Sequence, residues 1–381
     1  MVDKCICEFE NLVNKQLERI KIMKENVEII NIKTKNPIVI GVCGGDGIGP
    51  IIMKQAEKIL NLLLQKEIER NKIIIRNIEG LTLERRLEEQ VPIPREILKQ
   101  IKECDVILKG PTTTPRKADN YLNIESANVA LRKELDLFAN VRPIKIPDEG
   151  IDWTFFRENT EGSYALGNQG INVTDDLSID FTITTSQGTE RIIRAAFEYA
   201  KANKKKRVTA VTKANVIKTT DGKFLDIFYN IAKEYKDIDA DDWYIDIMTA
   251  KLIDKKRRSE FQVFVLPNLY GDIITDEAAE IKGGVGTAGS ANIGMRYAMF
   301  EAIHGSAPRM LEDGREKYAD PTSIFKATVM LLNYIGYEDK AKKLDRVLEK
   351  CLNDKKYKIT GRSNGLTNEE LTNILLKDLR W

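Results

Sequence analysis

Two acidic side chains stand four residues apart, just after a strongly apolar run. Asp272 and Asp276 lie in the stretch Asn-Leu-Tyr-Gly-Asp-Ile-Ile-Thr-Asp, and a spacing of four places both carboxylates on one face of a helix. Oxygen ligands of this kind select Mg²⁺ or Mn²⁺ over zinc. Asp246, an acid inside an apolar run, is a candidate third ligand. The alternative is a helix whose first turn is enriched in acids, which suits the helix dipole.

Three arginines lie beside apolar residues, where a guanidinium rarely stands without a partner. They are Arg132, Arg142 and Arg157. The planar fork of each can bind a carboxylate through two hydrogen bonds, and Ser126 and Asn128 can add neutral donors. The pattern indicates a small substrate with several carboxylates, with structural salt bridges as the alternative for any one arginine.

Two further groups are candidates for catalysis or ligand binding. The single histidine, His304, is followed by Gly305, Ser306 and Ala307, and small residues let a ligand approach the backbone closely. One histidine excludes a histidine-based zinc site and offers no Ser/His/Asp triad. Lys213 directly follows a predicted strand and is a candidate acid/base group if it faces a cleft; a solvated loop lysine is the alternative.

The elements that must position these groups alternate along the chain. Short β-branched runs predict buried strands at 38–42, 73–78, 105–109, 208–212 and 262–266. Helical patterns occur at 51–69, 94–102, 188–203, 222–235 and 322–335. This alternation predicts an α/β fold. The turn Gly45-x-Gly47-x-Gly49 fails the Rossmann fingerprint and is interpreted as a strand-to-helix turn.

Two segments depart from this alternation. Residues 8–30 carry one stripe of apolar residues at helical spacing, and 162–185 combines glycine-rich turns with an alternating apolar pattern. We predict a helix for the first and a hairpin excursion for the second.

The composition excludes several classes of partner. The 381 residues include 60 Lys and Arg against 58 Asp and Glu, a net charge of +2, so no global field attracts nucleic acid or a membrane. The basic run 201–207 is interpreted as a solvated helix end. Five scattered cysteines predict no disulfide framework, and no apolar run approaches the ~20 residues of a membrane helix. We expect a cytoplasmic enzyme that acts on a small molecule, with no nucleic-acid or membrane partner.

Taken in order, these residues resemble the isocitrate and isopropylmalate dehydrogenase family from about residue 38 to about 370. The motif at 268–276 followed by Gly-Gly-Val-Gly, and Glu-Ala-Ile-His-Gly-Ser-Ala-Pro at 301–308, carry the resemblance. It implies a two-domain α/β fold that is not Rossmann-like and has a clasp-like excursion. The domains expected are an N-terminal helical extension at 1–36, a large domain at 37–137 and 283–381, a small domain at 138–161 and 186–282, and the clasp at 162–185.

The resemblance further implies oxidative decarboxylation of isocitrate to 2-oxoglutarate and CO₂. In this family the residues before the first substrate arginine set the substrate, and Ser126 and Asn128 resemble the isocitrate type. Arg132, Arg142 and Arg157 would clamp the carboxylates of this tricarboxylate. Homoisocitrate and 3-isopropylmalate are the alternative substrates.

The same resemblance implies roles for the acid/base and metal groups. Lys213 would take the proton of the substrate hydroxyl, and Tyr164 matches the tyrosine that protonates the enolate. Asp246, Asp272 and Asp276 would hold Mg²⁺ or Mn²⁺. Because the groups matching Lys213 and Asp246 come from the neighbouring subunit, a homodimer with shared active sites is implied. A noncatalytic regulatory subunit of a heteromeric enzyme is the alternative from another class.

A nicotinamide cofactor is implied as well. The residues that would bind it are Thr114, Asn215, Glu301, His304, Gly305, Ser306, Ala307, Arg309 and Asp320. Arg309 can bind the 2′-phosphate of NADP, whereas the loop at 360–367 resembles NAD-type members. We favour NAD slightly, with NADP as the alternative.

Overall fold

The chain forms two compact α/β units in this computed structural model. The structure describes residues 2–25, 30–115, 124–166, 169–284, 286 and 288–380. The first unit comprises 1–29 and 136–282, and the second comprises 30–135 and 283–381. The residue Val27 of the predicted N-terminal stripe and residues 167–168 of the predicted excursion lie outside the described residues. The predicted α/β class is confirmed in both units.

The sheet of the first unit has the strand order β4-β5-β10-β8-β9. Its strands are β4 (Ala139–Ile146), β5 (Ile151–Glu158), β8 (Arg207–Thr212), β9 (Asp239–Tyr244) and β10 (Val263–Leu266). β4 is antiparallel to β5, and the other neighbours are parallel. Trp153, Phe155 and Phe264 are fully buried, and the rings of Phe155 and Phe264 stack with centroids 4.4 Å apart. This aromatic core fixes β5 against β10, so that their carboxyl ends lie side by side.

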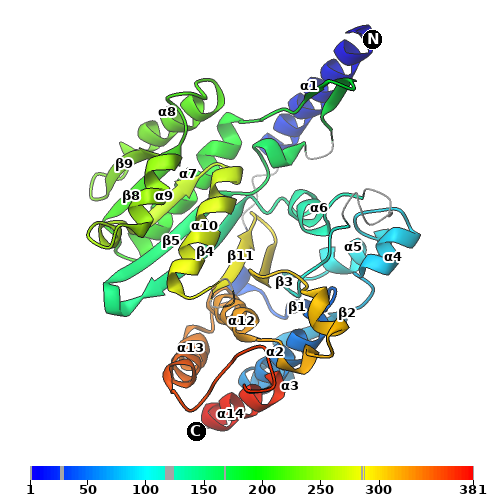
Figure 1. Ribbon diagram of the computed structural model, residues 1–381, viewed down its shortest axis with the longest axis vertical. Coiled ribbons are helices and arrows are strands. Elements are labelled where there is room, and N and C mark those ends of the chain that lie inside the picture. The colour runs from blue at the N-terminus through cyan, green and yellow to red at the C-terminus, as the bar shows by residue number, and fades with distance from the viewer. Residues whose placement is uncertain are drawn as a thin grey trace. The chain divides into compact units, whose positions relative to one another are not determined.

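Four helices pack against the strands of this sheet (Figure 1). They are α7 (Ser186–Ala202), α8 (Thr220–Ala232), α9 (Ile245–Ile253) and α10 (Asn268–Lys282). α7 packs against α8, and α9 packs against α10. α7 buries Ile192, Ile193, Ala196 and Phe197, an inner face at helical spacing. The strands predicted at 208–212 and 262–266 and the helices predicted at 188–203 and 222–235 are thus confirmed.

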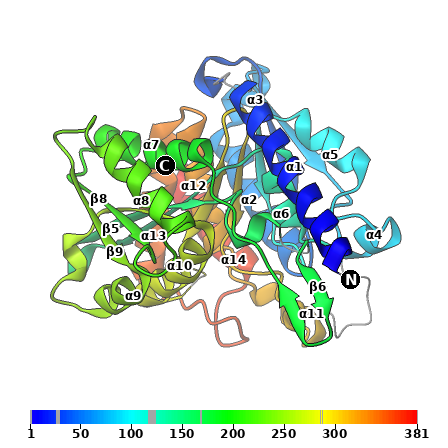
Figure 2. The same cartoon turned by 90° about the horizontal axis from the view of Figure 1, so that it is seen from above.

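The first unit also carries the N-terminal helix and a small ribbon. Helix α1 (Val2–Glu25) lies beside the antiparallel pair β6 (Ile171–Thr174) and β7 (Leu177–Ile179), as Figure 2 shows. The predicted helix and hairpin are confirmed. Of the apolar stripe, Leu12 and Met23 are buried, whereas Phe9 and Leu17 are about half exposed.

The second unit contains the strand order β2-β1-β3-β12-β11. These strands are β1 (Ile38–Cys43), β2 (Ile73–Ile78), β3 (Val106–Lys109), β11 (Gly289–Ile293) and β12 (Ala298–Ala302). β11 is antiparallel to β12, and the others run parallel. The strands predicted at 38–42, 73–78 and 105–109 are confirmed.

The second unit also contains helices. They are α2 (Gly49–Leu63), α3 (Gln65–Glu69), α4 (Leu83–Glu88), α5 (Arg95–Lys102), α6 (Ala127–Glu134), α11 (Pro308–Glu312), α12 (Thr322–Tyr334), α13 (Glu338–Asn353) and α14 (Asn368–Arg380). Of these, α2, α3, α5 and α12 pack against the strands of the unit. The helix predicted at 51–69 is two helices, because the backbone leaves helical geometry at Leu64.

Short 3₁₀ turns occur in both units. They are η1 (Ile32–Thr34), η3 (Pro147–Glu149), η4 (Ser163–Ala165), η5 (Arg258–Glu260) and η7 (Glu316–Tyr318).

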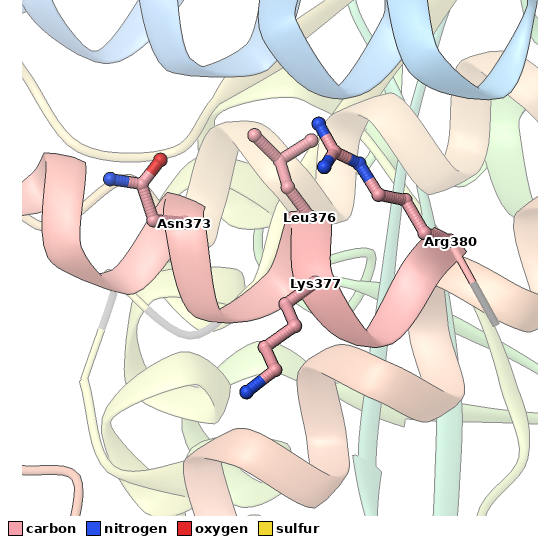
Figure 3. A pocket seen from close by; sticks show the side chains of 4 residues that line it. All are labelled: Asn373, Leu376, Lys377 and Arg380. Carbon is pink, nitrogen blue, oxygen red and sulfur yellow. The ribbon is translucent and has the colours of Figure 1, made fainter.

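One surface pocket of the second unit lies on α14. Asn373, Leu376, Lys377 and Arg380, all from this helix, line it (Figure 3). None of the residues singled out from the sequence lines this pocket. Over the described residues, the structure also contains no helix with the length and hydropathy to span a membrane.

Candidate active site

The carboxyl ends of β5 and β10 bring Arg157 and Asp272 together. Arg157 pairs with Leu266 in the register of the two strands, and α10 begins two residues after Leu266, which places Asp272 in its second turn. The Arg157 side chain is 1% exposed, and its Nη1 donates to the Asp272 carboxylate. A Cβ on Gly271 would lie 2.5 Å from Cγ of Arg157, so glycine is needed for this approach.

A second arginine–aspartate pair lies one helical turn further along α10. Arg142 of β4 donates from Nη1 to Asp276 Oδ1 at 2.9 Å and to Thr275 Oγ1 at 2.6 Å. The Arg142 side chain is buried, while that of Asp276 is 58% exposed. Both predicted aspartates therefore lie on one helix face, each next to a predicted substrate arginine.

Tyr164 completes this cluster in the first unit. Its hydroxyl donates to Asp272 Oδ2 at 2.8 Å, and the Arg157 guanidinium lies 5.4 Å from the centre of its ring. Asn268 accepts from Nε and Nη2 of Arg157 at 3.1 and 2.7 Å, which orients the fork. A proton donor, an arginine and a carboxylate are thus within direct reach of one another.

Two buried carboxylates hold the loop before Tyr164, and sequence analysis missed both. Glu158 accepts from the backbone N–H of Thr160 and Glu161 at 2.9 and 2.5 Å. Glu161 accepts from the N–H and hydroxyl of Thr185, the N-cap of α7, at 2.9 and 2.5 Å. Burial raises the pKa of Glu158, and the neighbouring Glu161 raises it further. In the sequence these acids lie in a polar segment and carry no signal of burial.

Lys213 and Asp246 form a separate pair in the same unit. Each follows the end of one of two neighbouring parallel strands, β8 and β9, and Lys213 Nζ donates to Asp246 Oδ1 at 2.5 Å. This hydrogen bond lowers the pKa of Asp246. Among the described residues no three Asp, Glu, Cys or His side chains are placed to hold a metal ion. The three predicted metal ligands are therefore not gathered within the described part of this chain.

The chemistry of the donors nevertheless fits a divalent cation. Asp272 and Asp276 offer carboxylate oxygens, the ligands that Mg²⁺ and Mn²⁺ prefer, and their side chains are 37% and 58% exposed. Their present partners are guanidinium groups, which a substrate carboxylate can engage instead.

In the second unit, α6 carries the residues predicted to meet the far end of the substrate. Asn128 and Arg132 stand four apart on this helix, and Ser126 is its N-cap without a side-chain capping bond. Arg132 is 8% exposed. Its Nη2 donates to Glu301 at 3.4 Å, and its buried Nε has no hydrogen-bond partner in the described part of the chain. Such an orphaned donor fits a further anionic group.

Glu301 forms a buried ion pair with a lysine that sequence analysis missed. The register of β12 and β3 sets Glu301 beside Lys109, with Nζ 3.1 Å from Oε2 and the lysine wholly buried. Asn292 donates to Glu301 at 2.8 Å. Burial opposes ionisation of Glu301, but Lys109 and Arg132 outweigh it, and the pKa falls to about 2. Lys109 ends a predicted strand, where the sequence gives no sign of burial.

The glycine turn after β1 supports the predicted cofactor loop. Ile48 N–H donates to the Ser306 carbonyl at 3.0 Å, and a Cβ on Gly47 would lie 2.1 Å from that oxygen. The Ser306 and Thr113 hydroxyls are 2.6 Å apart. His304 Nε2 is buried with no hydrogen-bond partner in the described residues. This unsatisfied nitrogen fits a polar ligand group.

Another buried ion pair holds the loop next to Thr114. Asp46 accepts from the N–H of Thr113 at 2.6 Å, and Arg86, which is fully buried, donates to the carbonyl of Thr113 at 2.8 Å. Burial raises the pKa of Asp46. Sequence analysis missed both residues, since an arginine in a charged helical segment gives no sign of burial.

The remaining predicted cofactor residues are more open to solvent. Thr114, Asn215, Gly305 and Arg309 are exposed, and Ala307 is partly exposed with a positive φ of 44°. Asp320 accepts from Thr322 N–H at 2.8 Å, and burial raises its pKa. Asn215 belongs to the first unit, and the other predicted cofactor residues belong to the second.

Known proteins show which family shares this architecture. The model of the family described as isocitrate/isopropylmalate dehydrogenase matches residues 39–374. The chain is 39% identical over 331 residues to homoisocitrate dehydrogenase of Methanocaldococcus jannaschii, covering 83% of this chain and 90% of the relative. It is 40% identical over 324 residues to the NADP isocitrate dehydrogenase of Rickettsia prowazekii, covering 83% of this chain but only 63% of the relative.

A solved structure agrees with this match. Isocitrate dehydrogenase from Methylococcus capsulatus aligns with a TM-score of 0.80 at 33% identity, covering 90% of this chain and all of that one. The predicted fold, distinct from the Rossmann type, is confirmed. The chain belongs to the isocitrate/isopropylmalate dehydrogenase family of oxidatively decarboxylating enzymes.

Proposed function

We propose that the protein oxidises and decarboxylates isocitrate to 2-oxoglutarate and CO₂, with NAD or NADP and a divalent metal ion. The observation that carries this proposal is the cluster of Arg157, Asp272 and Tyr164 beside Arg142 and Asp276. It combines anion-binding forks, oxygen ligands and a proton donor in one place. A noncatalytic regulatory subunit does not need this set of residues. The presence of the whole set therefore favours a catalytic chain.

The residues of this chain divide the work as follows. Arg142 and Arg157 bind substrate carboxylates through their forks. Asp272 and Asp276, with Asp246, would hold the metal ion, which would supply Lewis-acid polarisation of the substrate oxygens. Lys213 takes the hydroxyl proton, and Tyr164 gives a proton to the carbon that loses CO₂; such acid/base groups typically contribute about 10²–10⁴-fold. The cofactor supplies the hydride acceptor.

Substrate choice rests on the second unit. Ser126, Asn128 and Arg132 lie at the start of α6 and along it, and offer two neutral polar groups and a buried cation. This set suits a third carboxylate better than the isopropyl group of 3-isopropylmalate, because an unpaired buried polar group costs about 1–3 kcal/mol. Homoisocitrate, which has the same charges and one more methylene, is the second candidate.

For the cofactor we favour NAD, with NADP as the alternative. The carboxyl group of the half-buried Asp320 disfavours a 2′-phosphate nearby, whereas the exposed Arg309 could bind one. His304, Ser306 and Glu301 would contact the cofactor together with the exposed Thr114, Asn215, Gly305 and Ala307.

A homodimer completes this proposal. Lys213 and Asp246 form a pair of their own, and exposed apolar side chains lie next to the site residues on the same helices: Ile247 and Ile253 on α9, and Leu269 and Ile273 on α10. A second copy of the chain would cover this apolar face and bring its Lys213 and Asp246 to the site.

We also assign the domains from these observations. The division of the chain after residues 135 and 282 supports a large domain at 37–137 and 283–381 and a small domain at 138–161 and 186–282. The extension is 1–36 and the clasp is 162–185. The five cysteines are all free, which suits a reducing compartment such as the cytoplasm.

The test is a spectrophotometric assay of the purified chain with Mn²⁺. Isocitrate, homoisocitrate and 3-isopropylmalate are each offered with NAD and with NADP. We expect turnover of isocitrate at a higher kcat/KM than of the other two acids. Turnover of 3-isopropylmalate alone would contradict the substrate assignment, and turnover of none of the acids would contradict the function.

A further inference from the structure

Helix α1 lies before the part of the chain that the family model matches, which begins at residue 39. It nevertheless reaches the active-site loop of the first unit. Arg19 donates from Nη2 to Thr160 Oγ1 at 3.2 Å, and its Nη1 lies 3.4 Å from Glu161 Oε1. The Arg19 side chain is 26% exposed and that of Glu161 is 4% exposed. A charged contact therefore joins the extension to the interior of this unit.

The ion-pair partner of Arg19, Glu161, lies beside a second buried carboxylate, Glu158. Glu158 and Glu161 are 2% and 3% exposed and lie three residues apart. The Thr160 hydroxyl donates to Glu158 at 2.7 Å, so this hydroxyl links the pair to Arg19. Two like charges removed from water are costly unless cations compensate them.

A second guanidinium reaches the cluster, but its charge is already shared. Arg191 of α7 donates to Thr160 Oγ1 at 3.0 Å, and it also forms a two-bond fork with Asp136 at 2.6 and 2.9 Å. Among the contacts of the described residues, the charge of Arg191 thus serves Asp136 as well as this pair, and Arg19 adds a second positive charge. The charge of Arg19 therefore offsets part of the negative charge of the pair.

The carboxylate pair sets the path of the chain into Tyr164. The Glu161 side chain is fixed by Thr185, its carbonyl accepts from Asn268 at 3.1 Å, and Gly162 N–H donates to the carbonyl of Ile183 at 2.8 Å. Tyr164 follows two residues after Gly162. Any shift of Glu161 toward water would therefore move the tyrosine hydroxyl away from Asp272.

We propose that Arg19 is a positioning residue for Tyr164: its guanidinium neutralises the buried pair Glu158 and Glu161 and so fixes the loop 160–164. The inference rests on the proposed function, in which Tyr164 is the proton donor. Without Arg19 the uncompensated pair displaces the loop, and a displacement of about 1 Å at a reacting group can lower a rate about 100-fold.

The first experiment measures amide hydrogen exchange in the full-length protein and needs no turnover. Arg19→Met is compared with Lys15→Met, which removes the same charge from an exposed position of the same helix. We expect the amides of 160–164 to exchange at least about tenfold faster in Arg19→Met, and at the parental rate in Lys15→Met. Parental protection in Arg19→Met, or equal loss in both variants, would overturn the proposal.

A conservative variant separates charge from packing. Arg19→Lys keeps the cation and should keep the exchange rates of 160–164 within about threefold of the parent. The comparison of Arg19→Lys with the parent also tests the proposal if Arg19→Met does not fold. Exchange in Arg19→Lys about tenfold or more above the parent would refute neutralisation as the mechanism.

The second experiment measures kinetics on isocitrate. In Arg19→Met we expect kcat to fall about 10- to 100-fold, with KM within about threefold, because the tyrosine acts in the chemical step. The ratio of variant to parental kcat should rise on acidification, since a proton on Glu158, which faces Arg191, replaces the lost charge. A change in KM instead of kcat, or a loss of kcat that does not depend on pH, would contradict the proposal. If the parent turns over no acid while the exchange result holds, the proposed function fails and the loop-fixing role of Arg19 stands.

Discussion

At the scale of single residues, the candidate site is a set of exchangeable ion pairs. Each predicted substrate arginine of the first unit is bonded to a predicted metal ligand: Arg157 to Asp272, and Arg142 to Asp276. The sequence and the family resemblance were sufficient to single out all four residues. They were not sufficient for Lys109, Glu158 or Glu161, because a buried charge looks like a surface charge until the tertiary structure buries it.

The metal assignment can be tested by an isosteric substitution. Asp272→Asn should lower metal-dependent kcat/KM on the order of 10³-fold, because it removes a carboxylate ligand while keeping the shape of the side chain. Circular dichroism should show an intact fold, and calorimetry should show weaker Mn²⁺ binding. Glu280→Gln, at an exposed position of the same helix, is the control. Full activity of Asp272→Asn would refute the metal site.

The buried pair of Glu301 and Lys109 predicts a pH dependence of stability. The pKa of Glu301 falls from its ordinary 4.5 to about 2 in the folded protein. A depressed carboxyl pKa contributes stability that is present above 4.5, on the order of 3 kcal/mol, and is lost as the pH falls toward 2.

Glu301→Gln should therefore lower the free energy of unfolding on the order of 3–5 kcal/mol at neutral pH, because Lys109 and Arg132 lose their counter-charge. The difference in the free energy of unfolding between this variant and the parent should narrow below about pH 4.5. Denaturant unfolding across this range measures it, with the exposed Glu312→Gln as control. A difference of constant size would contradict the ion-pair interpretation.

At the scale of elements, the confirmed predictions are those with strong local signals. β1, β2, β3, β8 and β10 are β-branched runs, and each was predicted from the sequence. β9 was not predicted, because its sequence Asp-Ala-Asp-Asp-Trp-Tyr is acidic. It is held as an edge strand by tertiary contacts, in which Arg207 and Thr209 of β8 donate to Asp241 at 2.6 and 2.7 Å.

Replacing two helical glycines by alanine should change the stability of the protein in opposite directions. Gly271→Ala in α10 should destabilise the protein by about 1–3 kcal/mol, since the new methyl would meet the Arg157 side chain at 2.5 Å. It should also lower kcat/KM by displacing that arginine. Gly222→Ala in α8, where nothing lies within 4 Å, should stabilise by about 0.5–1 kcal/mol. Unfolding midpoints measure both changes, and a stabilised Gly271→Ala would contradict the packing of Arg157 on α10.

At the scale of the whole molecule, the central expectation is a site shared between two copies. The three predicted metal ligands are not gathered within the described part of one chain, although the sequence places all of them in the first unit. No pattern within a sequence specifies which copy a ligand serves, so the family resemblance alone supplied that expectation.

Complementation between inactive variants tests the shared site. Tyr164→Phe and Lys213→Met should each be nearly inactive alone. If Lys213 serves the partner's site, mixed dimers contain one intact site, and refolding an equal mixture should restore about a quarter of the parental activity. Each variant refolded alone is the control. A mixture as inactive as its components would show that the site lies within one chain.

The arginine–aspartate pairing of the first unit has a thermodynamic consequence. A carboxylic acid that arrives without a cation must leave two aspartates facing its own negative charges, and a cation that arrives alone must leave two guanidinium groups uncompensated. Each ligand removes the penalty that the other would meet, so their affinities are linked and rise together by the same factor. The protein without ligands thereby discriminates against both the free metal ion and the metal-free acid. It selects the complex of the metal ion with the acid.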